Sequence, residues 1–191
     1  AAIPADRRWL TCAMTGAGTA TTVRTKIFDG LVGYSKELKP EPRLARAGQL
    51  SEDQRSLTLN LREGVKWHDG KPFTSADVAY SALNIWRKYH SRGRATFANL
   101  LTVETPDSLT AVLIFSKPAP YILSALSSAE SQVVPRHVYD GQDVLTNPAN
   151  SKPVGTGPYR FASWERGQYV RLERNPDYWD AGKPHFSALI F

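Results

Sequence analysis

The chain has 191 residues, and its 24 Lys and Arg against 18 Asp and Glu give a formal net charge of +6. Apolar residues make up 41% and charged residues 22%, a balance that can bury a core and excludes a wholly disordered chain. The single cysteine, Cys12, excludes an intramolecular disulfide framework, and the lack of any run of about 18 apolar residues excludes a membrane-spanning segment.

The amino-terminal third predicts a loop, a helix and a strand in that order. Small residues dominate the first 22 positions, and we expect residues 16–21 to form a loop. Val23, Ile27 and Leu31 then recur at helical spacing, with glycines soon after as stop signals. Pro40 and Pro42 mark an extended link, and residues 53–62 alternate apolar with polar side chains, as in a half-buried strand.

The middle of the chain predicts one helix and one hairpin. Thr74 followed by Asp77 resembles a capping box, and the apolar stripe after it predicts a helix that Gly93 ends. Residues 100–105 and 109–115 predict a hairpin, because the turn-forming sequence Pro-Asp-Ser separates them. Residues 121–126 predict a short helix after two prolines.

The last third predicts a loop and then strands. Residues 140–153 are rich in Gly, Asn and Pro and form a candidate domain boundary. Tyr159, Phe161, Val170 and Leu172 predict a hairpin that turns near Gly167, and residues 188–191 predict a final strand.

A search for catalytic and metal-binding patterns finds none. The four histidines occur singly, no nucleophile elbow is present, and Gly155-Thr156-Gly157 lacks the third glycine and the helix of a dinucleotide site. Basic residues are interleaved with acidic ones, as in residues 160–174. The sequence therefore predicts no enzyme, no metal, no cofactor and no nucleic-acid partner.

Four segments carry a resemblance to a known family. They are residues 27–32 (IFDGLV), 61–78 (LREGVKWHDGKPFTSADV), 153–159 (PVGTGPY) and 173–179 (ERNPDYW). The chain resembles the extracellular solute-binding proteins of ABC importers, of the oligopeptide-, dipeptide- and nickel-binding type. Because glycine, proline and cap residues meet backbone demands, we assign these motifs to the scaffold and not to ligand contact.

The resemblance implies a mixed α/β fold of the type II periplasmic-binding-protein kind, a clamshell whose second lobe is missing here. Residues 1–33 and 152–191 would form part of the first lobe, and residues 34–151 an inserted subsidiary α+β domain. The implied function is capture of a small solute, with a peptide as the first candidate, for delivery to membrane permease subunits. The implied location is the periplasm, or the cell surface as a lipoprotein, after removal of a signal peptide.

The expected ligand contacts come from placement in that clamshell. Gly18, Thr19 and Thr21 would face the cleft from the loop before the first helix. Ser128 and Ser131 would reach it from the segment after the Tyr121 helix. Phe97 is a further candidate, and the alternative for it is a place in the core.

Two other classes of function stay open. A ligand-sensing domain of a transcription regulator would have a helix-turn-helix encoded upstream, and an enzyme of unrecognised chemistry would bring titratable groups together in one pocket. The sequence does not identify the solute. A fragment without its second lobe is expected to bind ligand weakly and to dimerise through exposed apolar surface.

Overall fold

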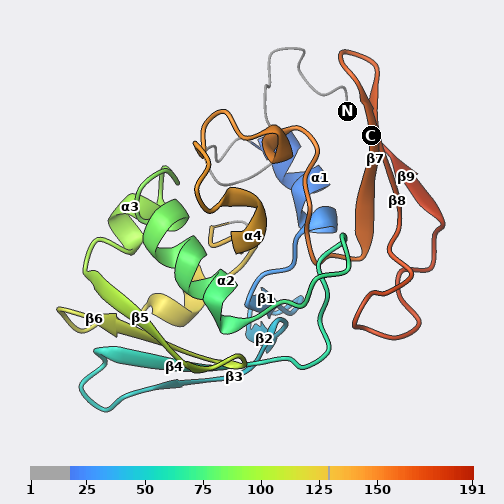
Figure 1. Ribbon diagram of the computed structural model, residues 1–191. Coiled ribbons are helices and arrows are strands. Elements are labelled where there is room, and N and C mark those ends of the chain that lie inside the picture. The colour runs from blue at the N-terminus through green and yellow to red at the C-terminus, as the bar shows by residue number, and fades with distance from the viewer. Residues whose placement is uncertain (1–17, 129) are drawn as a thin grey trace.

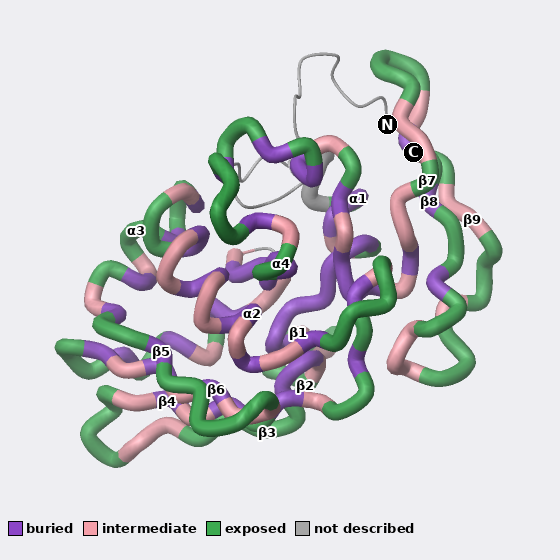
Figure 2. Tube along the Cα trace, viewed as in Figure 1, coloured by how far each residue is buried: buried purple, intermediate pink, exposed green. Residues whose placement is uncertain are grey.

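The computed structural model describes residues 18–128 and 130–191, which form three antiparallel sheets with short helices between them (Figure 1). In the first helix, side chains are described from Thr22 onward. The mixed α/β class predicted from the sequence is confirmed. Figure 2 shows the buried residues gathered between the helices and the large sheet, with the turns exposed around them.

The first elements are a helix and a small two-stranded sheet. Helix α1 spans Gly18–Ile27, and strand β1 (Val32–Tyr34) pairs with β2 (Pro40–Pro42). Between α1 and β1 the backbone is tightly packed, because a Cβ on Gly30 would lie 2.4 Å from the backbone nitrogen of Ser128. Only glycine fits at such a close approach.

The large sheet has the strand order β3-β4-β6-β5. Its strands are β3 (Ala45–Leu50), β4 (Ser56–Leu61), β5 (Leu100–Asp107) and β6 (Thr110–Phe115). The strict alternation in β4 buries all three leucines, Leu57, Leu59 and Leu61, on one face. That face receives the helices and becomes the centre of the core.

The helices of the middle region cover this face. Helix α2 (Ser75–Tyr80) continues into the π-helix η1 (Ser81–Trp86), and α3 (Gly93–Thr96) follows. Contacts join α2 to β5 and β6. Three shorter pieces come next: η2 (Ile122–Ala125), α4 (Arg136–Tyr139) and η3 (Pro148–Asn150).

The third sheet has the order β7-β8-β9 and lies beside α1 (Figure 1). Its strands are β7 (Tyr159–Glu165), β8 (Tyr169–Arg174) and β9 (Ala188–Ile190). The predicted hairpin is confirmed, with its turn at Gly167 in a positive-φ conformation that favours glycine.

The buried apolar residues form two clusters. The larger one runs from Leu31 to Ala149 and fills the space between the large sheet and its helices. The smaller one joins α1 to the third sheet through six residues: Val23, Ile27, Phe28, Tyr159, Val170 and Leu172. The division into residues 1–33 with 152–191 and residues 34–151 stays a prediction.

Two expectations about local structure were wrong, and one strand was not predicted. Residues 18–21 belong to α1 and not to a loop, because the helix begins earlier than its apolar stripe. Gly93 does not end the long helix, which stops at Trp86, but begins α3. The link at Pro40 and Pro42 is extended as predicted, and it pairs with β1 as a strand. Strand β3 was not predicted, because its exposed Arg-Ala-Gly-Gln sequence does not alternate apolar with polar residues.

Candidate functional site

The four sequence motifs meet at one junction between α1, the large sheet and the third sheet. His68 lies at its centre: its Nε2 is 3.0 Å from the carbonyl oxygen of Gly157, and the amide of Gly155 donates to its Nδ1 at 3.2 Å. These two bonds assign the neutral tautomer with the proton on Nε2. Burial lowers the pKa of His68 to about 4, so the ring stays neutral near pH 7.

The glycines of this junction allow two backbones to touch. The amide of Gly157 donates to the carbonyl oxygen of Ile27 at 2.8 Å. A Cβ on Gly155 would lie 1.9 Å from that same oxygen, a distance no side chain can adopt. The PVGTGPY motif therefore fixes the end of α1 by close backbone contact.

A buried carboxylate forms the second part of the junction. Asp29 accepts hydrogen bonds from the Trp179 indole nitrogen at 2.8 Å and the Tyr178 hydroxyl at 3.1 Å. The guanidinium of Arg62 stacks 4.1 Å from the centre of the Trp179 ring. One residue from each of three motifs is thus joined in a single chain of contacts.

A second buried carboxylate organises the start of α2. The predicted capping box is present, and the Thr74 amide donates to Oδ2 of Asp77 at 2.9 Å. The Trp67 indole donates to the same oxygen at 3.3 Å, and the Arg136 amide donates to Oδ1 at 2.8 Å. Asp77 is buried, and these donors replace its lost hydration.

A cavity of about 610 Å³ opens beside Asp29, at the carboxyl-terminal end of α1. Its wall is aromatic and charged. The aromatic residues are Phe28, Tyr34, Tyr159, Tyr178 and Phe186. The charged residues are Lys26, Asp29, Arg43, Asp180 and Lys183. A volume of this size admits a small molecule, with charges of both signs on the wall.

Burial sets the charge state of this wall. Desolvation raises the pKa of Asp29 to about 6, although its bonds from Trp179 and Tyr178 and the nearby Arg43 favour the carboxylate. Burial next to Asp29 also raises the pKa of the Tyr178 hydroxyl, which therefore stays protonated and donates. At neutral pH the cavity wall therefore carries the Asp29 carboxylate, which already accepts hydrogen bonds from Trp179 and Tyr178.

Chemistry beyond binding has little support in the described part of the chain. Residues 18–128 and 130–191 hold no group of three His, Cys, Asp or Glu side chains suited to a metal ion. His137 and Asp69 form an isolated pair at 2.6 Å, for which no third group is seen. Within the same residues, no helix has the length and apolar character needed to cross a bilayer.

The residues predicted from sequence to contact ligand are not gathered in this cavity. Ser128 lines it, next to Gly30. Gly18, Thr19 and Thr21 begin α1, whereas the cavity lies at the end of that helix, and their side chains lie outside the described residues.

Two further expected contacts are buried. Phe97 has no exposed surface and packs on Trp86 at 5.1 Å between ring centres, so the core alternative holds for it. Ser131 is also fully buried, and its hydroxyl donates to the carbonyl oxygen of Ala125. Sequence reasoning missed Asp29 and Tyr178 as cavity residues, although both lie in the family motifs, because those motifs were assigned wholly to the scaffold.

Comparisons with known proteins define the class to which this fold belongs. The model of the middle part of family 5 of the bacterial extracellular solute-binding proteins matches residues 39–191. This chain therefore belongs to family 5 of the bacterial extracellular solute-binding proteins.

Particular relatives share this architecture. A putative ABC transporter peptide-binding protein of Brucella ovis is 36% identical over 170 residues, which are 85% of this chain and 31% of that protein. The structure of the oligopeptide-binding protein AppA of Bacillus subtilis in complex with a nonapeptide matches with a TM-score of 0.86 and 26% identity, over 96% of this chain and 37% of that one. The protein AgaA of A. tumefaciens R10 in complex with agropinic acid matches with a TM-score of 0.85 and 32% identity, over 97% and 37%. The chain spans about a third of the length of these relatives.

Proposed function

We propose that this protein is the solute-capturing component of an ABC importer and that its solute is a peptide. The observation that carries the proposal is the family match over residues 39–191, together with a relative named as peptide-binding at 36% identity. In this role the protein binds its solute outside the cytoplasmic membrane, in the periplasm or at the cell surface, and presents it to permease subunits.

We place the solute contacts at the amino-terminal end of α1 and at Ser128. The first turn of a helix carries backbone amides without partners inside the helix, and Gly18, Thr19 and Thr21 belong to that turn. Such amides suit the carbonyl and carboxylate oxygens of a peptide backbone. Contacts to backbone groups alone would tolerate many side chains and give broad specificity.

Binding without turnover is part of the proposal. The matching family is described as solute-binding, and the relative at 36% identity is named as peptide-binding. Steady hydrolysis of peptides that depends on the protein would contradict this role.

The deciding experiment is native mass spectrometry of the complete gene product, purified without denaturation. We expect an added mass that is lost on unfolding and that fragments as a peptide. A bound mass of another chemical class would overturn the peptide assignment and leave capture of a solute standing. A bare protein that also gives no heat with a peptide mixture in calorimetry would contradict peptide capture.

A further inference from the structure

The surface over η1 and α3 carries a concentration of positive charge that the proposed function does not use. No Asp or Glu occurs between Asp77 and Glu104, and four cations fall within residues 87–94. These are Arg87, Lys88, Arg92 and Arg94, and all four are exposed. We call these four residues with Tyr80 and Tyr89 the basic face.

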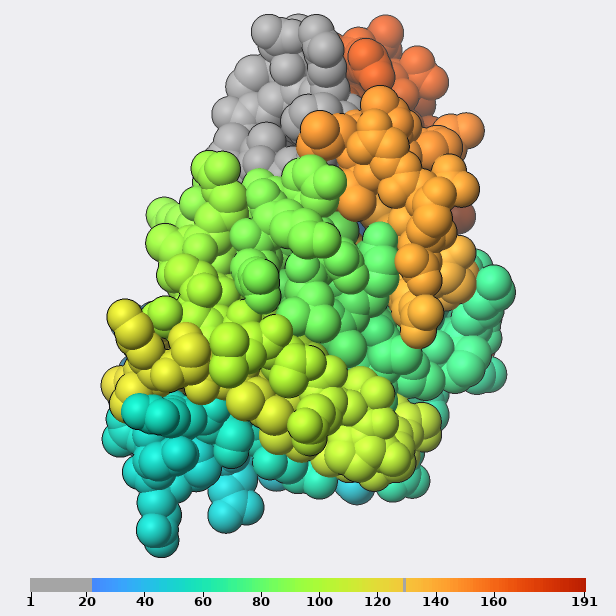
Figure 3. All heavy atoms as spheres, turned by 60° about the vertical axis from the view of Figure 1, so that its left-hand side comes forward, coloured from blue at the N-terminus to red at the C-terminus, as the bar shows by residue number. Residues whose placement is uncertain are grey.

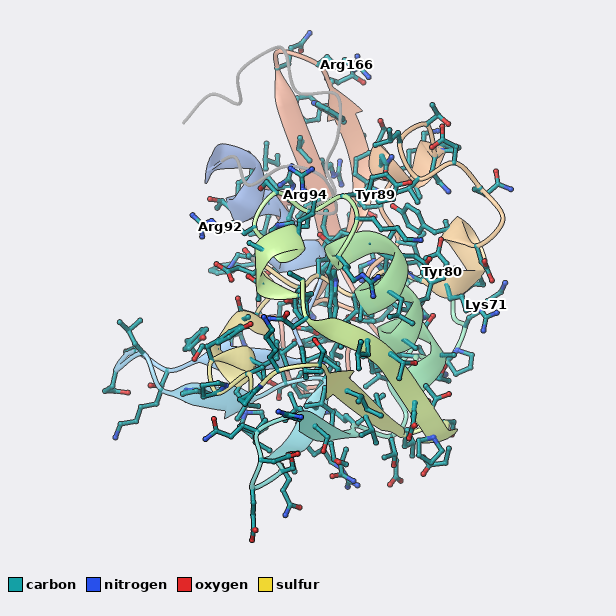
Figure 4. The ribbon with its side chains drawn as sticks, turned by 90° about the vertical axis from the view of Figure 1, so that its left-hand side faces the viewer. Lys71, Tyr80, Tyr89, Arg92, Arg94 and Arg166 are labelled. Carbon is teal, nitrogen blue, oxygen red and sulfur yellow. The ribbon has the colours of Figure 1, made fainter. Side chains whose placement is uncertain are left out.

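The structure brings the basic face together on one side of the molecule. Residues of α2, η1 and α3 occupy the middle of the face seen in Figure 3. Figure 4 shows Tyr80, Tyr89, Arg92 and Arg94 following one another across this side. The π-helix contributes to the arrangement, since a wider turn rotates the residues that follow it relative to those before it.

An ion pair neutralises one of these cations and leaves the other three without an acidic partner among the described residues. Arg92 pairs with Glu130 at 2.9 Å, and Asp140 is taken by Arg136 at 3.0 Å. Arg87 donates to the carbonyl oxygen of Leu100, and Lys88 to the side-chain oxygen of Asn84, both of which are uncharged partners. Among the residues that the structure describes, Arg94 forms no ion pair.

The two tyrosines are half-buried beside the cations. Tyr80 and Tyr89 border a hollow of about 200 Å³ together with Asn84, Lys88 and Asp140, whose carboxylate pairs with Arg136. This hollow is smaller than the pockets that enclose small molecules. Cations next to half-buried tyrosines are suited to a membrane–water interface. The tyrosine rings can lie at the level of the headgroups, and the cations can contact anionic groups there.

We propose that the basic face binds the phosphate-bearing headgroups of an anionic membrane surface. Each cation near such a surface strengthens attachment about five-fold, so a few of them give reversible binding without insertion. The inference stands on this surface alone and does not depend on the peptide assignment.

Sedimentation of the protein with vesicles tests the proposal. Phosphatidylcholine vesicles that contain a third of phosphatidylglycerol are compared with pure phosphatidylcholine vesicles at low salt. We expect binding to the anionic vesicles only, and its loss in 0.5 M NaCl because the charges are then screened. Equal binding to both vesicles would overturn the proposal.

A pair of charge-matched variants locates the site. Lys88→Gln, Arg92→Gln and Arg94→Gln together remove three charges from the basic face, and we expect about a 100-fold weaker partition coefficient. Lys36→Gln, Lys39→Gln and Lys117→Gln remove three exposed charges elsewhere and should leave the partition coefficient within about two-fold of the parent. An equal loss of the partition coefficient in both variants would show that binding depends only on the net charge of the protein, and it would overturn the proposal.

Two competitors separate the headgroup surface from other anions. Inorganic phosphate should displace the protein no better than chloride at the same ionic strength, and stronger displacement would indicate a site for free phosphate instead. Tighter binding to duplex DNA than to anionic vesicles would assign the basic face to nucleic acid. Circular dichroism confirms that each variant is folded before it is compared.

Discussion

At the residue scale, two buried ionisable groups of the motif junction respond to pH with opposite sign. His68 is neutral in the folded protein down to a pKa of about 4, whereas an unfolded histidine takes up its proton near 6.5. Asp29 has a pKa of about 6 in the folded protein, raised by burial from its ordinary value of 3.8. The contributions of the two groups oppose each other between pH 4 and 6, so each must be isolated by substitution.

For His68, the unfolded chain binds the additional proton between pH 4 and 6.5, and the stability that His68 contributes is therefore lost as the pH falls through this window. We expect the unfolding free energy of the parent, minus that of His68→Gln, to rise by up to about 3 kcal/mol from pH 4 to pH 6.5. Urea unfolding at four pH values measures it. A flat difference would show that the ring is accessible to protons in the folded state.

For Asp29, the folded protein binds the additional proton between pH 3.8 and 6. Its contribution to stability therefore falls as the pH rises through this window. We expect the unfolding free energy of the parent, minus that of Asp29→Asn, to decrease by about 3 kcal/mol from pH 3.8 to pH 6. This change is opposite in sign to the one expected for His68. A rise with pH would contradict the raised pKa.

The close approach at Gly155 also predicts a large effect from a single methyl group. Gly155→Ala places a Cβ 1.9 Å from the Ile27 carbonyl oxygen. Residue 155 and Ile27 are in close backbone contact there, so neither can move away easily. We expect a loss of more than about 3 kcal/mol of unfolding free energy. Gly48→Ala is the matched control: its nearest neighbours are flexible leucine side chains at 3.0 and 3.2 Å, and a change below about 1 kcal/mol is expected.

At the element scale, α2 depends on Asp77 for more than its cap. This carboxylate accepts from the amides of Thr74 and Arg136 and from the Trp67 indole, and it thereby joins the helix to two loops. Asp77→Asn should cost about 3 kcal/mol in chemical unfolding, because an amide nitrogen would then face a buried donor. The same change at Asp53, an exposed turn residue, should cost less than about 1 kcal/mol.

The elements also show where pattern reasoning succeeds and where it stops. The alternation of leucines in β4 predicts the strand, since one buried face per strand imposes a period of two. Strand β3 has four exposed residues in a row, and only its pairing with β4 makes it a strand. The π-helix η1 follows α2 without any sequence signal, because the apolar spacing of a wide turn is close to that of an ordinary one.

At the scale of the whole molecule, exposed apolar side chains predict self-association. Phe186 and Ile190 are each 71% exposed, and Ile190 lies on β9, an edge strand of the third sheet. We expect a concentration-dependent dimer in sedimentation equilibrium that Ile190→Lys weakens at least ten-fold. Leu101→Lys, at a 59% exposed position on β5, should not weaken it, and equal effects would contradict an interface at β9.

The sequence by itself determined the family and the fold class, through four motifs. The glycines, prolines and capping residues of these motifs are required by turns and helix ends, and such local requirements can be recognised in the sequence. Only the tertiary structure decided that Phe97 and Ser131 are buried, that Asp29 lies on a cavity wall, and that Arg92 and Arg94 lie on the same side as Tyr80 and Tyr89 (Figure 4). Burial and shared faces depend on residues far apart in sequence, and no local period encodes them.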